Sequence, residues 1–345
     1  SISELQMENN SLIKHEKIKE ILKGYKVIWS LKHFSELAKW DLETYMPPEG
    51  LEARGEALSK IASLSQKIFL EEKFVSQIEE ASRINDLNDY EKGIVRMLLK
   101  ELKMYKKLPP EFIEEFAKAT TESNAAWTEA RKKNDFSIFE PYLNKIVELS
   151  KKKAEYFGYK ESPYDALLDE YEEGLTSMEV DRYFKEIKDP IINLLNKITS
   201  SKGYKENHGL EEEEYDNELM HKFNNELLKF IHGELKHLRI DISAHPFSTS
   251  FGKGDYRVTT RYDKKDFART YGSTMHEYGH ALYNIQTHDE LHYTPISEGT
   301  SLVIHESQSR FWENFIGRSK EFISLILKDI EKAQPSINKY NLEEI

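Results

Sequence analysis

The sequence contains no cysteine, which excludes disulfide bonds and thiolate metal ligands and is compatible with a reducing compartment. It has no apolar run close to the roughly 18 residues that a membrane-spanning helix requires. Basic residues are in the minority, with 49 Lys and Arg against 61 Asp and Glu, so the formal net charge is −12. We therefore expect a cytoplasmic protein with no membrane partner. Because no basic stripe offsets the negative charge, we expect no nucleic-acid partner either.

The remaining composition is that of a globular protein. Of the 345 residues, 39% are hydrophobic and 32% are charged, which allows a sizeable core. Helical periodicity recurs along most of the chain, without an internal repeat or a low-complexity linker. This pattern predicts a single, mostly helical domain over residues 1–345. The expected helices cover 11–39, 51–68, 87–107, 110–127, 136–157, 176–200, 211–237, 266–286 and 300–316. The acidic run Glu211–Glu214 is expected in the N-terminal turn of its helix, where the helix dipole favours negative charge.

Residues 238–263 have a different period. Apolar and polar residues alternate around Ile240 and again around Val258, and Gly252 and Gly254 lie between the two runs. Alternation with period two is typical of strands, and the glycines permit a tight turn. The sequence therefore predicts a β-hairpin just before the helix 266–286.

A free edge of that hairpin is a place where an extended peptide can add as a further strand. His245, Arg257 and Arg261 are the expected substrate contacts, because a guanidinium grips a terminal carboxylate with two hydrogen bonds. The alternative is a hairpin with a purely structural role.

The helix 266–286 carries a His-Glu-x-x-His pattern. His276 and His280 are four residues apart and so lie on one side of the helix, opposite an apolar stripe that includes Tyr271 and Met275. Two imidazoles at this spacing chelate one ion, and zinc takes such nitrogen ligands readily. Glu277 projects about 100° away from His276, which suits it to act on water as a general base. The alternative is a solvated helix face without a metal.

A catalytic zinc site needs a third protein ligand. The carboxylates that follow in the sequence are Asp289, Glu290, Glu298 and Glu306. Glu306 is the predicted ligand and Glu298 the reserve. Glu306 shares a polar stripe of the helix 300–316 with Ser309, Arg310 and Glu313, whereas Ile304, Phe311 and Phe315 lie on the other side. Arg310, Glu313 and Glu298 are expected to contact the ligands and orient them.

These motifs together resemble those of the thermostable (Taq-type, M32) metallocarboxypeptidases. The matching blocks are T-Y-M-P-P at 44–48, D-I-S-A-H-P-F at 241–247, D-Y-R-V-T-T-R-Y at 255–262, H-E-Y-G-H at 276–280 and H-E-S-Q-S-R at 305–310. The resemblance covers essentially the whole chain. The H-E-S-Q-S-R block is far more specific than the metal motif alone.

The resemblance implies a mainly helical fold with a deep groove, a small sheet beside the metal site, and a homodimer. It implies His276, His280 and Glu306 as metal ligands and Glu277 as the general base. Zn²⁺ is the expected ion, with Co²⁺ or Mn²⁺ as alternatives. Members of the family continue beyond the point where this chain ends, so we expect the family's C-terminal segment to be missing and the activity to be weak.

Three functions remain open from the sequence. The first is a metallocarboxypeptidase acting on peptides with a free C-terminus. The second is an oligopeptide endopeptidase with a similar zinc site. The third is a non-catalytic helical protein that binds a metal or another protein.

Overall fold

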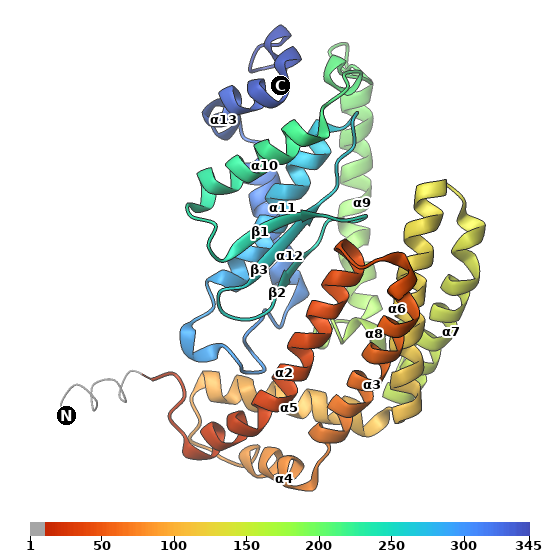
Figure 1. Cartoon of the computed structure of the whole chain (residues 1–345), viewed down its shortest axis with the longest axis vertical. Helices are drawn as coiled ribbons and strands as arrows, with labels where there is room; N and C mark the ends of the chain where they lie inside the picture. The colour runs from red at the N-terminus through yellow and green to blue at the C-terminus, as the bar shows by residue number, and fades with distance from the viewer. Residues whose placement is uncertain (1–10) are drawn as a thin grey trace, which may run out of the picture. The chain divides into compact units, whose positions relative to one another are not determined.

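The computed structural model describes residues 11–345 and divides into two compact units. The N-terminal unit contains the described residues up to Leu167, together with 251–253 and 284–300. The sheet unit contains Leu168–Ser250, Gly254–Tyr283 and Ser301–Ile345. The predicted class of fold, mostly helical with a small sheet, is confirmed (Figure 1). The deep groove stays a prediction.

Capping residues and prolines begin several helices of the N-terminal unit. The side chain of Asn88 accepts a hydrogen bond from the backbone N–H of Glu91, and the Glu91 carboxylate accepts one from the backbone of Asn88. Pro110 occupies the first turn of its helix, where the missing N–H has no intrahelical partner. The α-helices are α2 (Glu16–Thr44), α3 (Leu51–Phe69), α4 (Glu72–Ala81), α5 (Asp89–Lys107), α6 (Pro110–Lys133), α7 (Glu140–Phe157) and α8 (Pro163–Leu168).

The core of the N-terminal unit lies mainly between α2, α4 and α5. Ile21, Ile78 and Leu98 contribute one fully buried side chain from each of these helices. A second cluster joins α6 and α7 through Phe112 and Leu149. The unit is thus held together by the apolar stripes that the helical periodicity predicts.

The sheet unit places three strands and a long helix beside one another. In Figure 1, α11 lies directly behind the sheet, and the hydroxyl of Thr274 in α11 is 3.5 Å from that of Thr260. Among residues 11–345, no helix combines the length and the apolar composition needed to cross a membrane.

The helices and strands of the sheet unit are α9 (Ser177–Thr199), α10 (Asn217–His232), β1 (Leu238–Ile242), β2 (Ser248–Ser250), β3 (Tyr256–Thr260), α11 (Phe267–Ile285), α12 (Leu302–Arg310) and α13 (Lys320–Ala333). A π-helical turn at Phe311–Ile316 follows α12. Short 3₁₀ turns occur in both units, at Pro48–Gly50, Phe136–Ile138 and Asp289–Leu291 in the N-terminal unit and at Gly209–Glu211 and Pro335–Lys339 in the sheet unit.

The strands pair differently from the predicted hairpin. β1 and β3 are neighbours, but they run parallel, with Leu238 opposite Tyr256. The antiparallel partner of β3 is the short strand β2, which the sequence pattern did not reveal. Gly252 and Gly254 do form the turn, between β2 and β3, and both have positive φ angles of 110° and 87°. The predicted hairpin, in which the strand around Ile240 pairs with the strand around Val258 in antiparallel fashion, was therefore wrong. The strand that forms the hairpin with β3 is β2.

One further prediction needs correction, and one apolar surface stands out. The acidic run Glu211–Glu214 does not lie in the following helix, because α10 begins only after Asp216, whose side chain caps the backbone N–H of Leu219. The apolar side of the helix after residue 300 is not buried within the described residues. Ile304 is 49% exposed and Phe315 is 73% exposed.

Candidate metal centre

The apolar side of α11 fixes the direction of its histidines. Tyr271, Met275 and Tyr278 are at most 7% exposed. Tyr271 and Met275 pack in a cluster with side chains of α10 and α13. Because residues four apart lie on the same side of a helix, burial of this stripe turns His276 and His280 to the opposite side. Their ring centroids are 5.0 Å apart.

The second helix of the site, α12, approaches α11 at Gly279. A Cβ atom on Gly279 would lie 2.6 Å from the Cα of Ser309 and 2.7 Å from the backbone oxygen of Gln308. Ser309 is fully buried, and its hydroxyl is 3.1 Å from Oε2 of Glu306. The missing side chain at position 279 therefore lets α12 come close enough to place Glu306 against the histidines.

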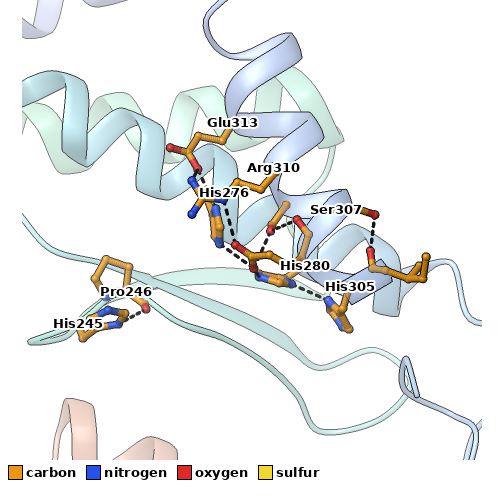
Figure 2. Close-up of polar contacts among 11 residues, drawn as sticks. His245, Pro246, His276, His280, His305, Ser307, Arg310 and Glu313 are labelled. Atoms are coloured by element: carbon orange, nitrogen blue, oxygen red, sulfur yellow. Dashed lines mark hydrogen bonds and ion pairs between the residues drawn. The ribbon is translucent and has the colours of Figure 1, made fainter. Parts of the chain in front are cut away.

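The three predicted ligands meet in the structure. Oε2 of Glu306 is 3.2 Å from Nε2 of His280 and 3.5 Å from Nε2 of His276. One ligand atom from each residue lies within 4.8 Å of the others. Figure 2 shows both imidazoles turned toward α12. Two imidazole nitrogens and one carboxylate oxygen are a donor set that zinc takes in catalytic sites, so these residues fit a divalent transition metal.

Arg310, the last residue of α12, and Glu313, in the π-helical turn that follows, contact the candidate ligands (Figure 2). Nδ1 of His276 is 2.8 Å from Oε2 of Glu313. A carboxylate at that distance accepts a hydrogen bond from Nδ1–H, which keeps the proton on Nδ1 and leaves Nε2 with a lone pair for a metal. Arg310 donates to Oε1 of Glu306 at 3.1 Å and to Oε2 of Glu313 at 3.3 Å. Both residues therefore contact the candidate ligands, and their orienting role stays a prediction.

His305 supports the other histidine, a role that the sequence pattern does not predict. Its Nδ1 is 2.6 Å from Nδ1 of His280, and the ring of Tyr283 packs against it at 4.7 Å. This contact leaves Nε2 of His280 directed toward Glu306. A signal was present in the sequence, because His305 immediately precedes a predicted ligand.

The pKa shifts of His280 and Glu306 favour the protonation states that bind a metal ion. Burial, followed by the neighbouring His305 and His276, lowers the pKa of His280 to about 4, so this imidazole is neutral near pH 7. Desolvation acts to raise the pKa of Glu306, but His276 and other neighbours hold it below its usual value. A neutral imidazole and an ionised carboxylate are the states that coordinate a cation.

Glu277 has the most perturbed carboxyl group of the site. It is only 6% exposed. Burial, followed by the negative charges of Glu306 and Glu313, raises the pKa of Glu277 to about 8. A carboxyl group with a pKa near the working pH is suited to accept and return a proton.

The structure does not gather every predicted residue at the cluster. His245 is exposed and lies apart from the ligands in Figure 2, with its Nδ1 2.6 Å from the backbone oxygen of Pro246. The guanidinium of Arg257 is bound by both carboxylate oxygens of Asp255, each at 2.8 Å.

Within residues 11–345, Arg261 and Glu298 make no hydrogen bond or ion pair with the cluster either. Arg261 directly follows β3, and its backbone oxygen accepts a hydrogen bond from Thr270. Glu298 belongs to the N-terminal unit, where the charges of Glu36 and Lys32 act on it. Contacts of these residues with a ligand or a substrate stay predictions.

An arrangement of this kind, with a buried glutamate between two histidines on one helix, is that of a metallopeptidase. The comparison with protein families makes the assignment specific. A sequence model of the carboxypeptidase Taq (M32) metallopeptidase family matches residues 18–345. The chain therefore belongs to this family. The predicted family and the predicted class of enzyme, a metallocarboxypeptidase that hydrolyses peptide bonds, are confirmed at this level.

Named relatives agree with the family. The chain is 45% identical over 335 residues to thermostable carboxypeptidase 1 of Pyrococcus furiosus, covering 97% of this chain and 67% of the relative. It is 37% identical to carboxypeptidase 1 of Bacillus subtilis, covering 88% of this chain and 62% of the relative. The chain thus spans about two thirds of the length of these curated relatives.

Solved structures show the same fold. A carboxypeptidase structure from Pyrococcus furiosus matches with a TM-score of 0.87 at 45% identity, over 97% of this chain and 67% of the other. An M32 carboxypeptidase from Deinococcus radiodurans matches with a TM-score of 0.83 at 28% identity, over 96% of this chain and 66% of the other. The small sheet and the helices around it are therefore those of the M32 carboxypeptidases.

Proposed function

We propose that this protein is a metal-dependent carboxypeptidase that removes C-terminal amino acids from peptides with a free C-terminus. The observation that carries the proposal is the cluster of His276, His280 and Glu306, whose ligand atoms lie within 4.8 Å of one another. The buried Glu277 belongs to the same helix turn. The names of the M32 relatives supply the substrate class.

His276, His280 and Glu306 would hold the metal, and we propose Zn²⁺, with Co²⁺ or Mn²⁺ as alternatives. A divalent ion bound there supplies Lewis acidity toward water and toward the carbonyl of the scissile peptide. Glu313 keeps the proton of His276 on Nδ1, and His305 does the same for His280, so that both Nε2 atoms remain ligands. Arg310 orients the carboxylate of Glu306 through its own hydrogen bond.

Glu277 is the proposed general base. Its carboxylate takes a proton from the attacking water and returns it to the nitrogen of the leaving amino acid. A cation at the three ligands favours the ionised form, because opposite charge lowers the pKa of a nearby carboxyl group. The low exposure of Glu277 keeps this proton away from bulk solvent.

The remaining proposals concern binding and organisation. We propose that Arg257, Arg261 and His245 contact the substrate, with an arginine gripping the terminal carboxylate. Glu298 is proposed as a further residue that orients the site. The uninterrupted family match supports one metallopeptidase domain built from both units. A homodimer and a cytoplasmic location, without nucleic-acid or membrane partners, complete the proposal.

The test is Glu277→Gln in the metal-loaded protein. Glutamine keeps the size of the side chain but cannot accept the proton, so turnover of a free-ended peptide should fall by about 100-fold or more. Metal content, measured by elemental analysis, should stay unchanged. Glu321→Gln, an exposed change in the first turn of α13, is the matched control. An active Glu277→Gln variant with full metal content would overturn the role of Glu277.

A second measurement separates the alternatives. A carboxypeptidase cleaves the free-ended peptide and spares the same peptide with an amidated C-terminus, whereas an endopeptidase cleaves both. A protein that binds metal and cleaves neither peptide would have a non-catalytic role. Products identified by mass spectrometry decide between the three results.

A further inference from the structure

The N-terminal unit contains a cavity of about 580 Å³. Its walls come from α2, α3, α5, α6 and α7, all of which belong to that unit. Much of the lining is apolar, and side chains from α2, α3 and α6 form it together with the residue that follows α5: Leu42, Leu58, Leu108, Phe112, Ile113 and Phe116. A volume of this size falls within the roughly 300–1,000 Å³ of small-molecule sites, which are also mostly apolar.

The positive charges of the cavity wall are already engaged. The ammonium group of Lys32 is 2.5 Å from a carboxylate oxygen of Glu101. That of Lys39 is 2.7 Å from a carboxylate oxygen of Glu36. Lys153 lies over the ring of Phe116, 4.8 Å from its centroid. An anionic ligand would have to compete with these contacts.

Within the described residues, Glu43 is the charged residue of the wall that has no hydrogen-bond or ion-pair partner. Its half-buried carboxylate makes no hydrogen bond or ion pair with any residue of the range 11–345. Burial, followed by the negative charge of Glu36, raises the pKa of this carboxyl group. The side-chain amide of Asn124, also in the lining, has no hydrogen bond within the same range. A carboxylate placed beside an apolar wall without a cation is costly, and a bound cation removes that cost.

We propose that this cavity binds a protonated amine that carries an aromatic or branched apolar group. The Glu43 carboxylate pairs with the ammonium group, Asn124 offers a further polar contact, and the leucine and phenylalanine side chains receive the apolar group. A free amine and the N-terminus of a peptide share this chemistry. None of the lining residues is one of the candidate metal ligands His276, His280 and Glu306.

Calorimetric titration of the whole protein with four probes tests the proposal. 2-Phenylethylamine represents a free amine, and phenylalanyl-glycinamide represents a peptide N-terminus without a free C-terminus. N-acetyl-2-phenylethylamine keeps the ring but has no charge, and 3-phenylpropionate reverses the charge. At least one of the amines should bind, and the neutral and anionic probes should bind about tenfold more weakly or worse, since a charge-assisted hydrogen bond contributes at least that factor.

Three variants locate the binding. Glu43→Gln should weaken the amine about tenfold, whereas Glu49→Gln, an exposed change between α2 and α3, should leave it unaltered. Ala62→Phe places a ring inside the cavity and should abolish binding of every probe, which keeps the test valid if Glu43→Gln does not fold. The proposal is overturned if neither amine binds, if the acetylated probe binds as well as the amine, or if binding survives Ala62→Phe.

Discussion

Replacement of Gly279 by alanine tests the close approach of the two ligand helices. An added methyl group would lie 2.6 Å from the Cα of Ser309, whereas an ordinary contact is at least 3.4 Å. The helices must therefore separate by about 0.8 Å, the difference between these distances. Metal sites tolerate ligand displacements of only about 0.2 Å, so this movement carries Glu306 out of reach of an ion shared with the histidines. We expect metal affinity to fall at least about tenfold.

Gly279→Ala is also expected to change the stability of the metal-free protein. An exposed helical glycine gains about 1 kcal/mol on replacement by alanine, but overpacking costs about 1–3 kcal/mol. Gly279→Ala should therefore destabilise the metal-free protein. Gly272→Ala in the same helix is the matched control, because its nearest contact, Oε1 of Glu313, would be an ordinary 3.7 Å away. We expect Gly272→Ala to be neutral or stabilising in urea unfolding. Equal metal affinity and equal stability of the two variants would refute the proposed tight crossing.

Two further predictions concern carboxylates. Glu313→Gln removes the negative charge 2.8 Å from Nδ1 of His276, so metal affinity measured by competition with a chelator should fall about 10- to 100-fold, with little change in the melting temperature of the metal-free protein. Glu91, 2% exposed, accepts the backbone N–H groups of Lys14 and His15 at 2.7 Å each. Desolvation raises the pKa of Glu91, but these hydrogen bonds hold it below its usual value. A lowered folded-state pKa gives stability that is complete above about pH 4.3 and is lost as the pH falls. Glu91→Gln should thus cost about 2 kcal/mol in urea unfolding at pH 7 and much less at pH 3; equal losses at both pH values would contradict this account.

The candidate metal site is largely predictable from the sequence, because its main signal is local. The spacing of His276 and His280 needs only the geometry of one helix, and the predicted range 266–286 is close to the observed Phe267–Ile285. The third ligand required more, because four downstream carboxylates were available. Its place in a polar stripe favours Glu306, and the structure places Glu306 and Glu313 of that stripe beside the histidines.

Strand pairing and one helix start escaped the sequence patterns for physical reasons. Period-two alternation is the same in parallel and antiparallel strands, so it does not reveal that Leu238 pairs in parallel with Tyr256. The acidic run Glu211–Glu214 has the composition of a first helical turn. However, the cap at Asp216 starts the helix later, because the capping side chain satisfies the backbone N–H of Leu219.

Residues whose roles depend on contacts between helices were the hardest to foresee. A glycine within a helical pattern, such as Gly279, indicates local weakness unless the neighbouring helix is known. His305 likewise acquires its role only through its contact with His280, 25 positions earlier in the chain. Neither contact follows from the periodicity of a single helix.

The three candidate ligands all belong to the sheet unit, and this location determines how the chain responds to a chelator. An ion that binds the native state adds about 4 kcal/mol of stability when its free concentration is about 1,000 times the dissociation constant. The added stability acts on the helices that supply the candidate ligands, α11 and α12. Amide hydrogen exchange with and without chelator should accordingly change first in α11 and α12, while the interior of α2 and α5 serves as an internal reference.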